Sequence, residues 1–159
     1  MTDHYKKCKR KVKKGSAFRA FSTESQVVPA DTSVKLFFKE EEFDLGREYD
    51  RCDSIFIPRK KGIYLVTGTV GFIPDSFEEN YRTRIEIRIN GNPFEAADND
   101  FWGTGVPFTN GVQVTAILKL NAGDEVEIYT ESSIPGVTAI SQPGFNVTAF
   151  AASILERIN

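Results

Sequence analysis

Apolar and polar residues alternate along much of the chain after residue 15, with the period of a half-buried β-strand. In residues 82–89, three isoleucines occupy one face and charged side chains occupy the other. The other strand-like runs cover residues 17–23, 34–38, 49–57, 63–73, 112–120, 125–129 and 145–158. Short strands separated by turn residues, with no helical period between them, predict an antiparallel β-sandwich.

Turn residues between these runs set the expected connections. Asn90-Gly91 is a strong two-residue hairpin signal, and residues 121–124 form a second turn. We expect Gly62 to close a charged hairpin tip with a positive φ. We expect residues 39–42 to form a polar segment outside the sheet, and residues 93–110 to form the longest loop.

Large aromatic residues recur at fixed intervals between residues 38 and 64. The fixed points are Phe38, Asp44, Tyr49, Phe56, Gly62 and Tyr64. Their spacing resembles the signature of the C1q domain, a branch of the C1q/tumour-necrosis-factor superfamily: Phe, five residues, Asn or Asp, four, an aromatic or Leu, six, Phe, five, then Gly-x-Tyr. Every interval is met, but Val66 and Gly68 stand where the pattern continues with aromatics.

Three further segments extend the resemblance over nearly all of residues 16–158. Residues 16–18 resemble the family's opening strand, residues 118–126 its LxLxxGDxV segment, and residues 150–155 its last strand. The resemblance implies an all-β, antiparallel ten-strand jelly-roll sandwich, as in a bacterial C1q-like protein. It also implies a homotrimer whose core or three-fold axis holds Phe18, Phe38, Tyr49, Phe56, Tyr64 and Phe150.

Two other sandwiches fit the residues less well. The immunoglobulin topology is the second choice, but the expected Cys, Trp, Cys arrangement is missing. A cupin, another jelly roll, needs several histidines, whereas the chain has one, His4.

Charge divides the chain into a basic arm, residues 1–15, and an acidic domain, residues 16–159. The net charge is −2, with seven Lys or Arg among the first 14 residues. The preferred interpretation of the arm is a solvated leader, with Cys8 as a free thiol, and the alternative is contact with an anionic partner. Because the body is acidic, no specific nucleic-acid partner is expected.

Catalytic chemistry has little support in the composition. A single histidine excludes His-based metal sites and Ser-His-Asp triads from the body. Carboxylate clusters remain, at 40–42, 78–79 and 98–100, so a glycan hydrolase with two facing carboxylates is the enzymatic alternative. We expect no enzyme and no resident cofactor.

The region 93–110 carries the candidate binding residues. Asp98 and Asp100 are candidate calcium ligands, since calcium accepts oxygen ligands from irregular loops, although a plain polar loop is the preferred reading. Phe101 and Trp102, with Phe108, are candidates to receive a protein or carbohydrate ligand. Their preferred role is structural, capping the sandwich or packing on a neighbouring subunit.

No segment reaches the ~20 apolar residues needed to span a bilayer, and no secretory signal is recognisable. Taken together, the sequence predicts a non-enzymatic, homotrimeric recognition, adhesion or structural module. We expect it to be extracellular or on a bacterial cell or spore surface. The alternative is a glycan-binding or receptor-binding tip protein of a phage or spore.

Overall fold

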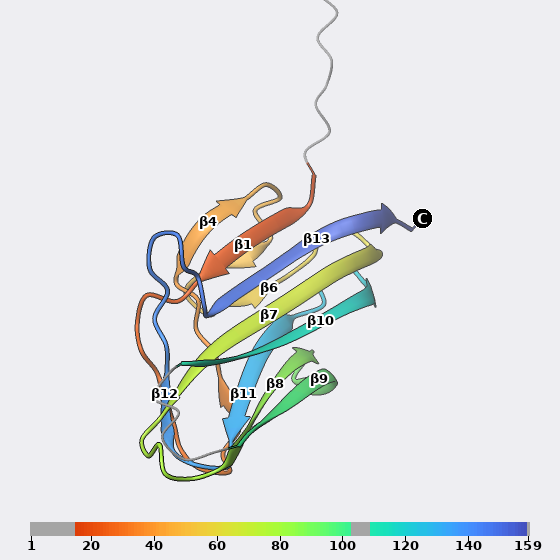
Figure 1. Cartoon of the computed structure of the whole chain (residues 1–159). Coiled ribbons are helices and arrows are strands. Elements are labelled where there is room, and N and C mark those ends of the chain that lie inside the picture. The colour runs from red at the N-terminus through yellow and green to blue at the C-terminus, as the bar shows by residue number, and fades with distance from the viewer. Residues whose placement is uncertain (1–14, 103–108, 159) are drawn as a thin grey trace, which may run out of the picture.

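The computed structural model describes residues 15–102 and 109–158 and contains two antiparallel β-sheets (Figure 1). All regular elements in these residues are strands. The strands are β1 (Ala17–Phe21), β2 (Val27–Val28), β3 (Val34–Lys35), β4 (Glu40–Asp44), β5 (Tyr49–Asp50), β6 (Ile55–Phe56), β7 (Gly62–Pro74), β8 (Tyr81–Ile89), β9 (Asn92–Phe101), β10 (Asn110–Leu120), β11 (Val126–Ser132), β12 (Gly136–Thr138) and β13 (Ala149–Arg157).

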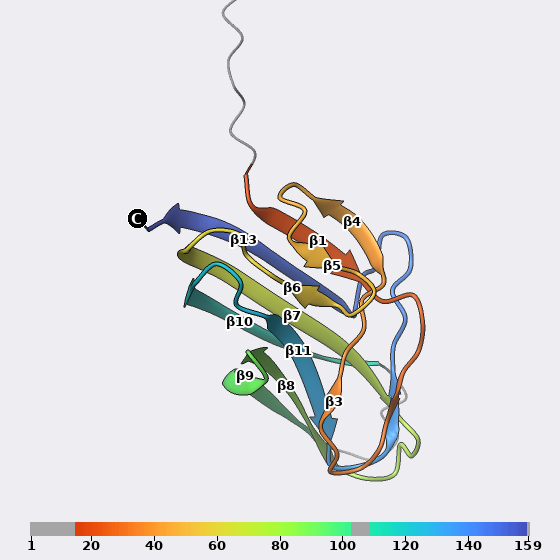
Figure 2. The same ribbon diagram turned by 180° about the vertical axis from the view of Figure 1, so that it is seen from behind.

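The longest strand, β7, organises the larger sheet, which we call sheet A. Its strand order is β2-β12-β7-β13-β1-β4, and β10 pairs with β7 over eleven residues. The smaller sheet, sheet B, has the order β5-β6-β11-β8-β9, with β3 also paired to β11. Figures 1 and 2 show the two layers from opposite sides. The predicted all-β antiparallel sandwich is confirmed.

The hydrophobic core lies between the two sheets and follows the predicted alternation. On β8, Ile85 and Ile87 are fully buried, and on β7 the same holds for Tyr64, Val66 and Val70. Each such side chain contributes about 1.5–3 kcal/mol when removed from water. The period-2 pattern of residues 82–89 therefore identified the inward face of β8 correctly.

The Asn90-Gly91 hairpin is present, and it corrects the expected loop at 93–110. Asn90 and Gly91 have φ of 52° and 77°, both positive as a type I′ turn requires. The chain then returns beside β8 as strand β9, which ends only at Phe101. Small and charged residues in this stretch concealed the strand, because β9 is an edge strand and such residues suit an exposed edge.

Two other expectations need correction. Residues 40–44 form an exposed edge strand, β4, which pairs with β1, and not a polar segment outside the sheet. Gly62 is absent from the positive-φ residues of the described chain; a Cβ there would lie 2.5 Å from the Glu156 carbonyl oxygen, so close approach of β13 requires the glycine. The described residues form thirteen strand segments, four of only two residues, within the two sheets of the expected jelly roll.

Candidate functional site

The six aromatic residues singled out in the sequence lie together inside one chain. Phe18 is central: its ring centroid lies 4.4 Å from that of Tyr49, 4.9 Å from that of Phe56 and 4.9 Å from that of Phe150. Phe38 packs on Phe150, and Tyr64 packs on Phe56. All six are buried. Residues that can contact another molecule therefore lie elsewhere, on the outer faces of the sheets and at their ends.

Tyr64 shows how fully this aromatic cluster is buried. Its side chain is fully buried, and its hydroxyl donates a 2.8 Å hydrogen bond to the Lys60 carbonyl. Burial raises the pKa of the phenol, because the charged phenolate is poorly solvated there. The residue is therefore placed as a core residue of the monomer.

The outer face of sheet A carries exposed apolar side chains on neighbouring strands. Leu65 on β7 stands opposite Ile117 on β10 and Ser153 on β13. Ile117 is 67% exposed and Leu65 37%. Phe43 and small residues of β1 and β13 join Leu65 around a shallow depression of about 260 Å³. We call the residues Phe43, Leu65, Ile117, Ala151 and Ser153 the sheet A face.

A small polar cluster adjoins the sheet A face. The Thr67 and Thr115 hydroxyls lie 3.0 Å apart, and the Gln113 amide donates to both, at 3.2 Å and 3.1 Å. These side chains hydrogen-bond to one another across β7 and β10, so a partner can cover the bonded groups at low desolvation cost. The face as a whole combines apolar groups with polar groups that are already hydrogen-bonded.

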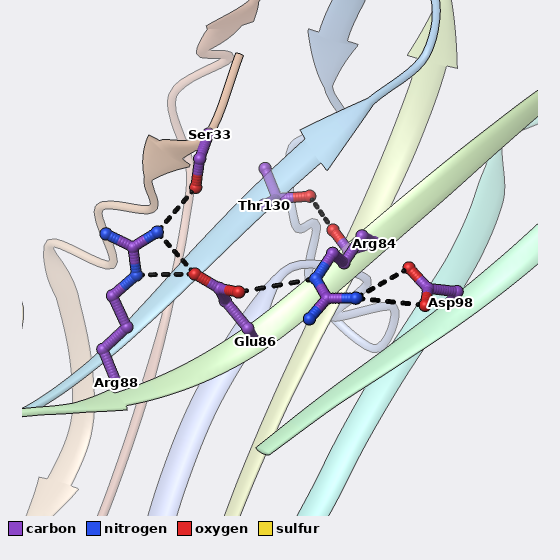
Figure 3. Close-up of polar contacts among 6 residues, drawn as sticks. All are labelled: Ser33, Arg84, Glu86, Arg88, Asp98 and Thr130. Carbon is purple, nitrogen blue, oxygen red and sulfur yellow. Dashed lines mark hydrogen bonds and ion pairs between the residues drawn. The ribbon is translucent and has the colours of Figure 1, made fainter. Parts of the chain in front are cut away.

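The outer face of sheet B is charged instead (Figure 3). Glu86 lies between two arginines on β8: Arg88 Nε donates to Glu86 Oε1 at 2.5 Å, and Arg84 Nε lies 3.4 Å from Glu86 Oε2. Arg88 also donates to Ser33 at 2.9 Å, and its guanidinium lies 3.8 Å from the Tyr129 ring centroid. The Glu86 carboxylate is nearly buried under these groups.

Other carboxylates of this face are paired as well. Lys35 on β3 forms an ion pair with Glu127 on β11, and Arg84 lies 3.2 Å from Asp98. A two-carboxylate hydrolase needs one group free to give a proton and another free to attack or to activate water. The paired carboxylates of this face are held by cations, which suits a structural role better than acid-base chemistry.

The two candidate calcium ligands lie on strand β9 and not in a loop. Asp98 stands opposite Arg84 and Asp100 opposite Arg82 in the β8–β9 register. Within residues 15–102 and 109–158, no group of three or more His, Cys, Asp or Glu side chains is gathered as a metal site. Calcium binding stays a prediction, and the Asp98 carboxylate is already engaged by Arg84.

The candidate ligand residues Phe101 and Trp102 lie at one end of sheet B. Phe101 is the last residue of β9, and its ring centroid lies 5.0 Å from that of Tyr81. Trp102 follows it and is largely exposed. They border a hollow of about 210 Å³, also lined by Tyr81, Arg82, Asp100 and Ser133. We call this the Trp102 hollow.

The sequence had indicated only part of this hollow. Arg82, Tyr81 and Ser133 were not singled out, because they come from β8 and from the segment after β11, and only pairing of the strands brings them to Trp102. Phe108, Cys8, His4 and the rest of the basic arm lie outside the described residues. The interactions expected of them stay predictions.

Comparison with known proteins confirms the fold. No protein-family model and no curated protein sequence matches the chain. Among solved structures, the chain is similar to Eiger TNF from S. frugiperda, with a TM-score of 0.67 and 11% identity over 92% of this chain and 96% of that one. It is also similar to the globular domain of zebrafish complement 1qA protein, with a TM-score of 0.59 and 14% identity over 90% and 99%. The chain thus has the jelly-roll fold of C1q/TNF-like structures.

Proposed function

We propose, from the premise of a C1q/TNF-like jelly-roll domain, that the protein is a non-enzymatic homotrimeric recognition module. The subunits meet through the sheet A face, and the ligand is bound elsewhere on the surface. The module acts outside the cell, on a bacterial cell or spore surface. Adhesion and a structural role in a surface layer are variants of this proposal, in which the bound ligand is another macromolecule.

The observation that carries this proposal is the sheet A face. Leu65 and Ile117 oppose each other on the two most extensively paired strands, and Phe43 lies across the depression beside Leu65. Contiguous exposed apolar side chains are unfavourable on a monomer and mark surfaces that a partner covers. A second copy is the partner we propose, because C1q-type domains assemble as compact homotrimers.

The polar cluster of Thr67, Thr115 and Gln113 supports the same arrangement. Its hydrogen bonds are made within one chain, so burial against another subunit leaves these bonds intact. Polar groups inside an apolar interface also restrict how subunits can align, as buried polar residues do in coiled coils. We expect the cluster to set the register of the trimer more than its affinity.

The charge pattern favours binding over catalysis. Glu86 and Asp98 are held by arginines, and Glu127 is held by Lys35. No helix in the described residues is long and apolar enough to cross a membrane. The surface location is a separate proposal, which rests on the likeness to C1q-type heads.

Light scattering coupled to gel filtration tests the proposal. We expect a mass near three times the 17.8 kDa of one chain. The double substitution Leu65→Asp and Ile117→Asp places two charges in the interface, and it should give a folded monomer. Phe94→Asp is the control, since Phe94 is an apolar residue on sheet B that is about as exposed as Ile117. A native mass of one chain would contradict the proposal.

A further inference from the structure

The most exposed large apolar side chain of the described residues is Trp102, at 74%. It is also the only tryptophan of the chain. A tryptophan is usually largely buried, and an exposed indole offers a wide, rigid contact surface whose ordering costs little entropy. Its position on the Trp102 hollow therefore suggests a surface built for contact.

The floor beneath this indole is rigid. Phe101 packs on Tyr81, whose ring centroid lies 5.5 Å from that of the fully buried Phe72. The Tyr81 hydroxyl accepts a hydrogen bond from the Asn110 side chain on β10. Because both sheets hold this floor, a ligand meets a preformed site and loses little binding energy to ordering it.

The rim of the hollow carries an arginine and a carboxylate in register. Arg82 and Asp100 are direct partners across β8 and β9. Within the described part of the chain, neither side chain forms a hydrogen bond or ion pair, whereas the next pair on the same face, Arg84 and Asp98, is joined at 3.2 Å. Donors and an acceptor are thus left available beside the indole.

We infer that the Trp102 hollow binds a saccharide, which names the ligand class of the recognition function proposed above and rests on that function. A pyranose ring has an apolar C–H face and hydroxyl groups around its edge. The C–H face packs on the Trp102 indole, while the Arg82 guanidinium donates to ring hydroxyls and the Asp100 carboxylate accepts from them. A few convergent polar groups beside an aromatic surface are typical of a small-ligand site.

Other ligand classes fit the hollow less well. Its volume, about 210 Å³, is below the roughly 300–1,000 Å³ of drug-sized pockets, so it accepts one ring and not a folded partner. A nucleic-acid strand would require a basic surface, whereas Asp98 and Asp100 face outward on β9 beside the hollow. An anionic ligand would likewise be repelled by Asp100.

The location of the hollow suits a recognition module. Figure 1 shows β9 ending at the end of the sandwich opposite to the start of β1 and to the C-terminus. A site there points away from both described chain ends. In a trimer, three such hollows would act together on a surface with many sugar residues, which raises avidity without any new contact.

Tryptophan fluorescence provides a direct test, because Trp102 is the sole indole. The full chain is titrated with the methyl glycosides of glucose, galactose, mannose and N-acetylglucosamine up to about 50 mM, since a single-ring site of millimolar affinity corresponds to only about 4 kcal/mol. We expect a saturable change in emission with at least one glycoside. Saturation with none of the four would overturn the inference.

Matched substitutions locate the effect. Asp100→Ala and Arg82→Ala should each weaken binding about tenfold or more, because each removes charge-assisted hydrogen bonds. Asp98→Ala, two residues away on the same face but outside the hollow, should change the affinity less than about twofold. An equal loss in Asp98→Ala and Asp100→Ala would also overturn the inference.

The same samples separate the two proposals. If the native mass is that of a trimer but no glycoside binds, the saccharide inference fails and the trimeric module stands. If the chain is a monomer and a glycoside saturates the signal, the trimer is wrong and the Trp102 hollow is upheld.

Discussion

The Tyr49 hydroxyl donates a 2.6 Å hydrogen bond to the backbone carbonyl of Phe38, and both residues are buried. The backbone N–H of Tyr49 is in turn bound by the Asp44 carboxylate at 2.9 Å. Three fixed points of the aromatic spacing, at 38, 44 and 49, are thus joined to one another. The spacing of these residues therefore has a structural reason, because Tyr49 is hydrogen-bonded to both Phe38 and Asp44.

Removal of this hydroxyl tests the relationship. Tyr49→Phe should lower the free energy of unfolding by about 1–3 kcal/mol, since the buried Phe38 carbonyl loses its donor. Urea unfolding monitored by circular dichroism measures the change. The control is Tyr129→Phe, because the Tyr129 hydroxyl forms no hydrogen bond within the described residues. Its free energy of unfolding should stay within ~0.5 kcal/mol of the parent value. Equal stability of the two variants would contradict the argument.

Alkaline pH should destabilise the fold through its buried tyrosines. Burial raises the pKa of Tyr49, Tyr64 and Tyr81 above the ordinary value of 10.0. The unfolded chain therefore releases these protons at lower pH than the folded one. Their contribution to stability is complete below about pH 10 and is lost as pH rises above it. Unfolding free energies measured from pH 8 to pH 11 should be level and then fall, and a fall that begins below pH 9 would need another cause.

Periodicity predicted the sandwich and the inward face of β8, but not the strand register that forms the Trp102 hollow. Counted from the Asn90-Gly91 turn, a regular hairpin would place Arg82 opposite Asn99. A bulge between Ile87 and Arg88 shifts the pairing by one, so Arg82 faces Asp100. A one-residue shift moves side chains to the other face of a strand. The bulge was not predicted from the local residue pattern.

Edge strands were the other elements that sequence reasoning missed. β4 and β9 have mostly exposed residues, so they lack the apolar alternation by which inner strands are recognised. The burial of Glu86 also came from elsewhere in the chain, because the arginines and Ser33 that cover it lie around β8 only after folding. Local patterns encode core contacts well and encode long-range polar pairing poorly.

Gly62 should resist substitution although its φ is ordinary. An added Cβ would lie 2.5 Å from the Glu156 carbonyl oxygen and 2.9 Å from the Ile154 side chain. The β13 backbone cannot move away without loss of its pairing with β7. Gly62→Ala should therefore cost about 1–3 kcal/mol. Gly111→Ala, on β10 with open space around it, should be neutral or slightly stabilising. Thermal melts of both variants measure the difference, and equal melting temperatures would refute the close-approach argument.

The basic arm should be dispensable for folding, but a deletion that extends to Ser16 should not be tolerated. Deletion of residues 1–14 removes seven like charges, which cannot be buried together, and should leave the melting temperature within a few degrees. Ser16 marks the limit, because its hydroxyl donates to the buried Glu48 and its carbonyl accepts from Ile154 N–H at 2.9 Å. Deletion of residues 1–16 should therefore lower the melting temperature clearly. Loss of the trimer in the shorter deletion would show that the arm is structural.

The aromatic cluster and the Trp102 hollow should respond in opposite ways to truncation. Phe56 and Tyr64 pack with ring centroids 5.7 Å apart, and both are fully buried. Truncation of either to Ala should cost about 3–5 kcal/mol, a large part of the roughly 5–15 kcal/mol that stabilises a domain. We expect aggregated or unfolded protein from both variants. Trp102→Ala removes an exposed side chain, so it should fold, melt close to the parent and lose only ligand binding. If Tyr64→Ala instead melted like the parent and Trp102→Ala collapsed, the core would lie elsewhere and the C1q-like alignment would have to be abandoned.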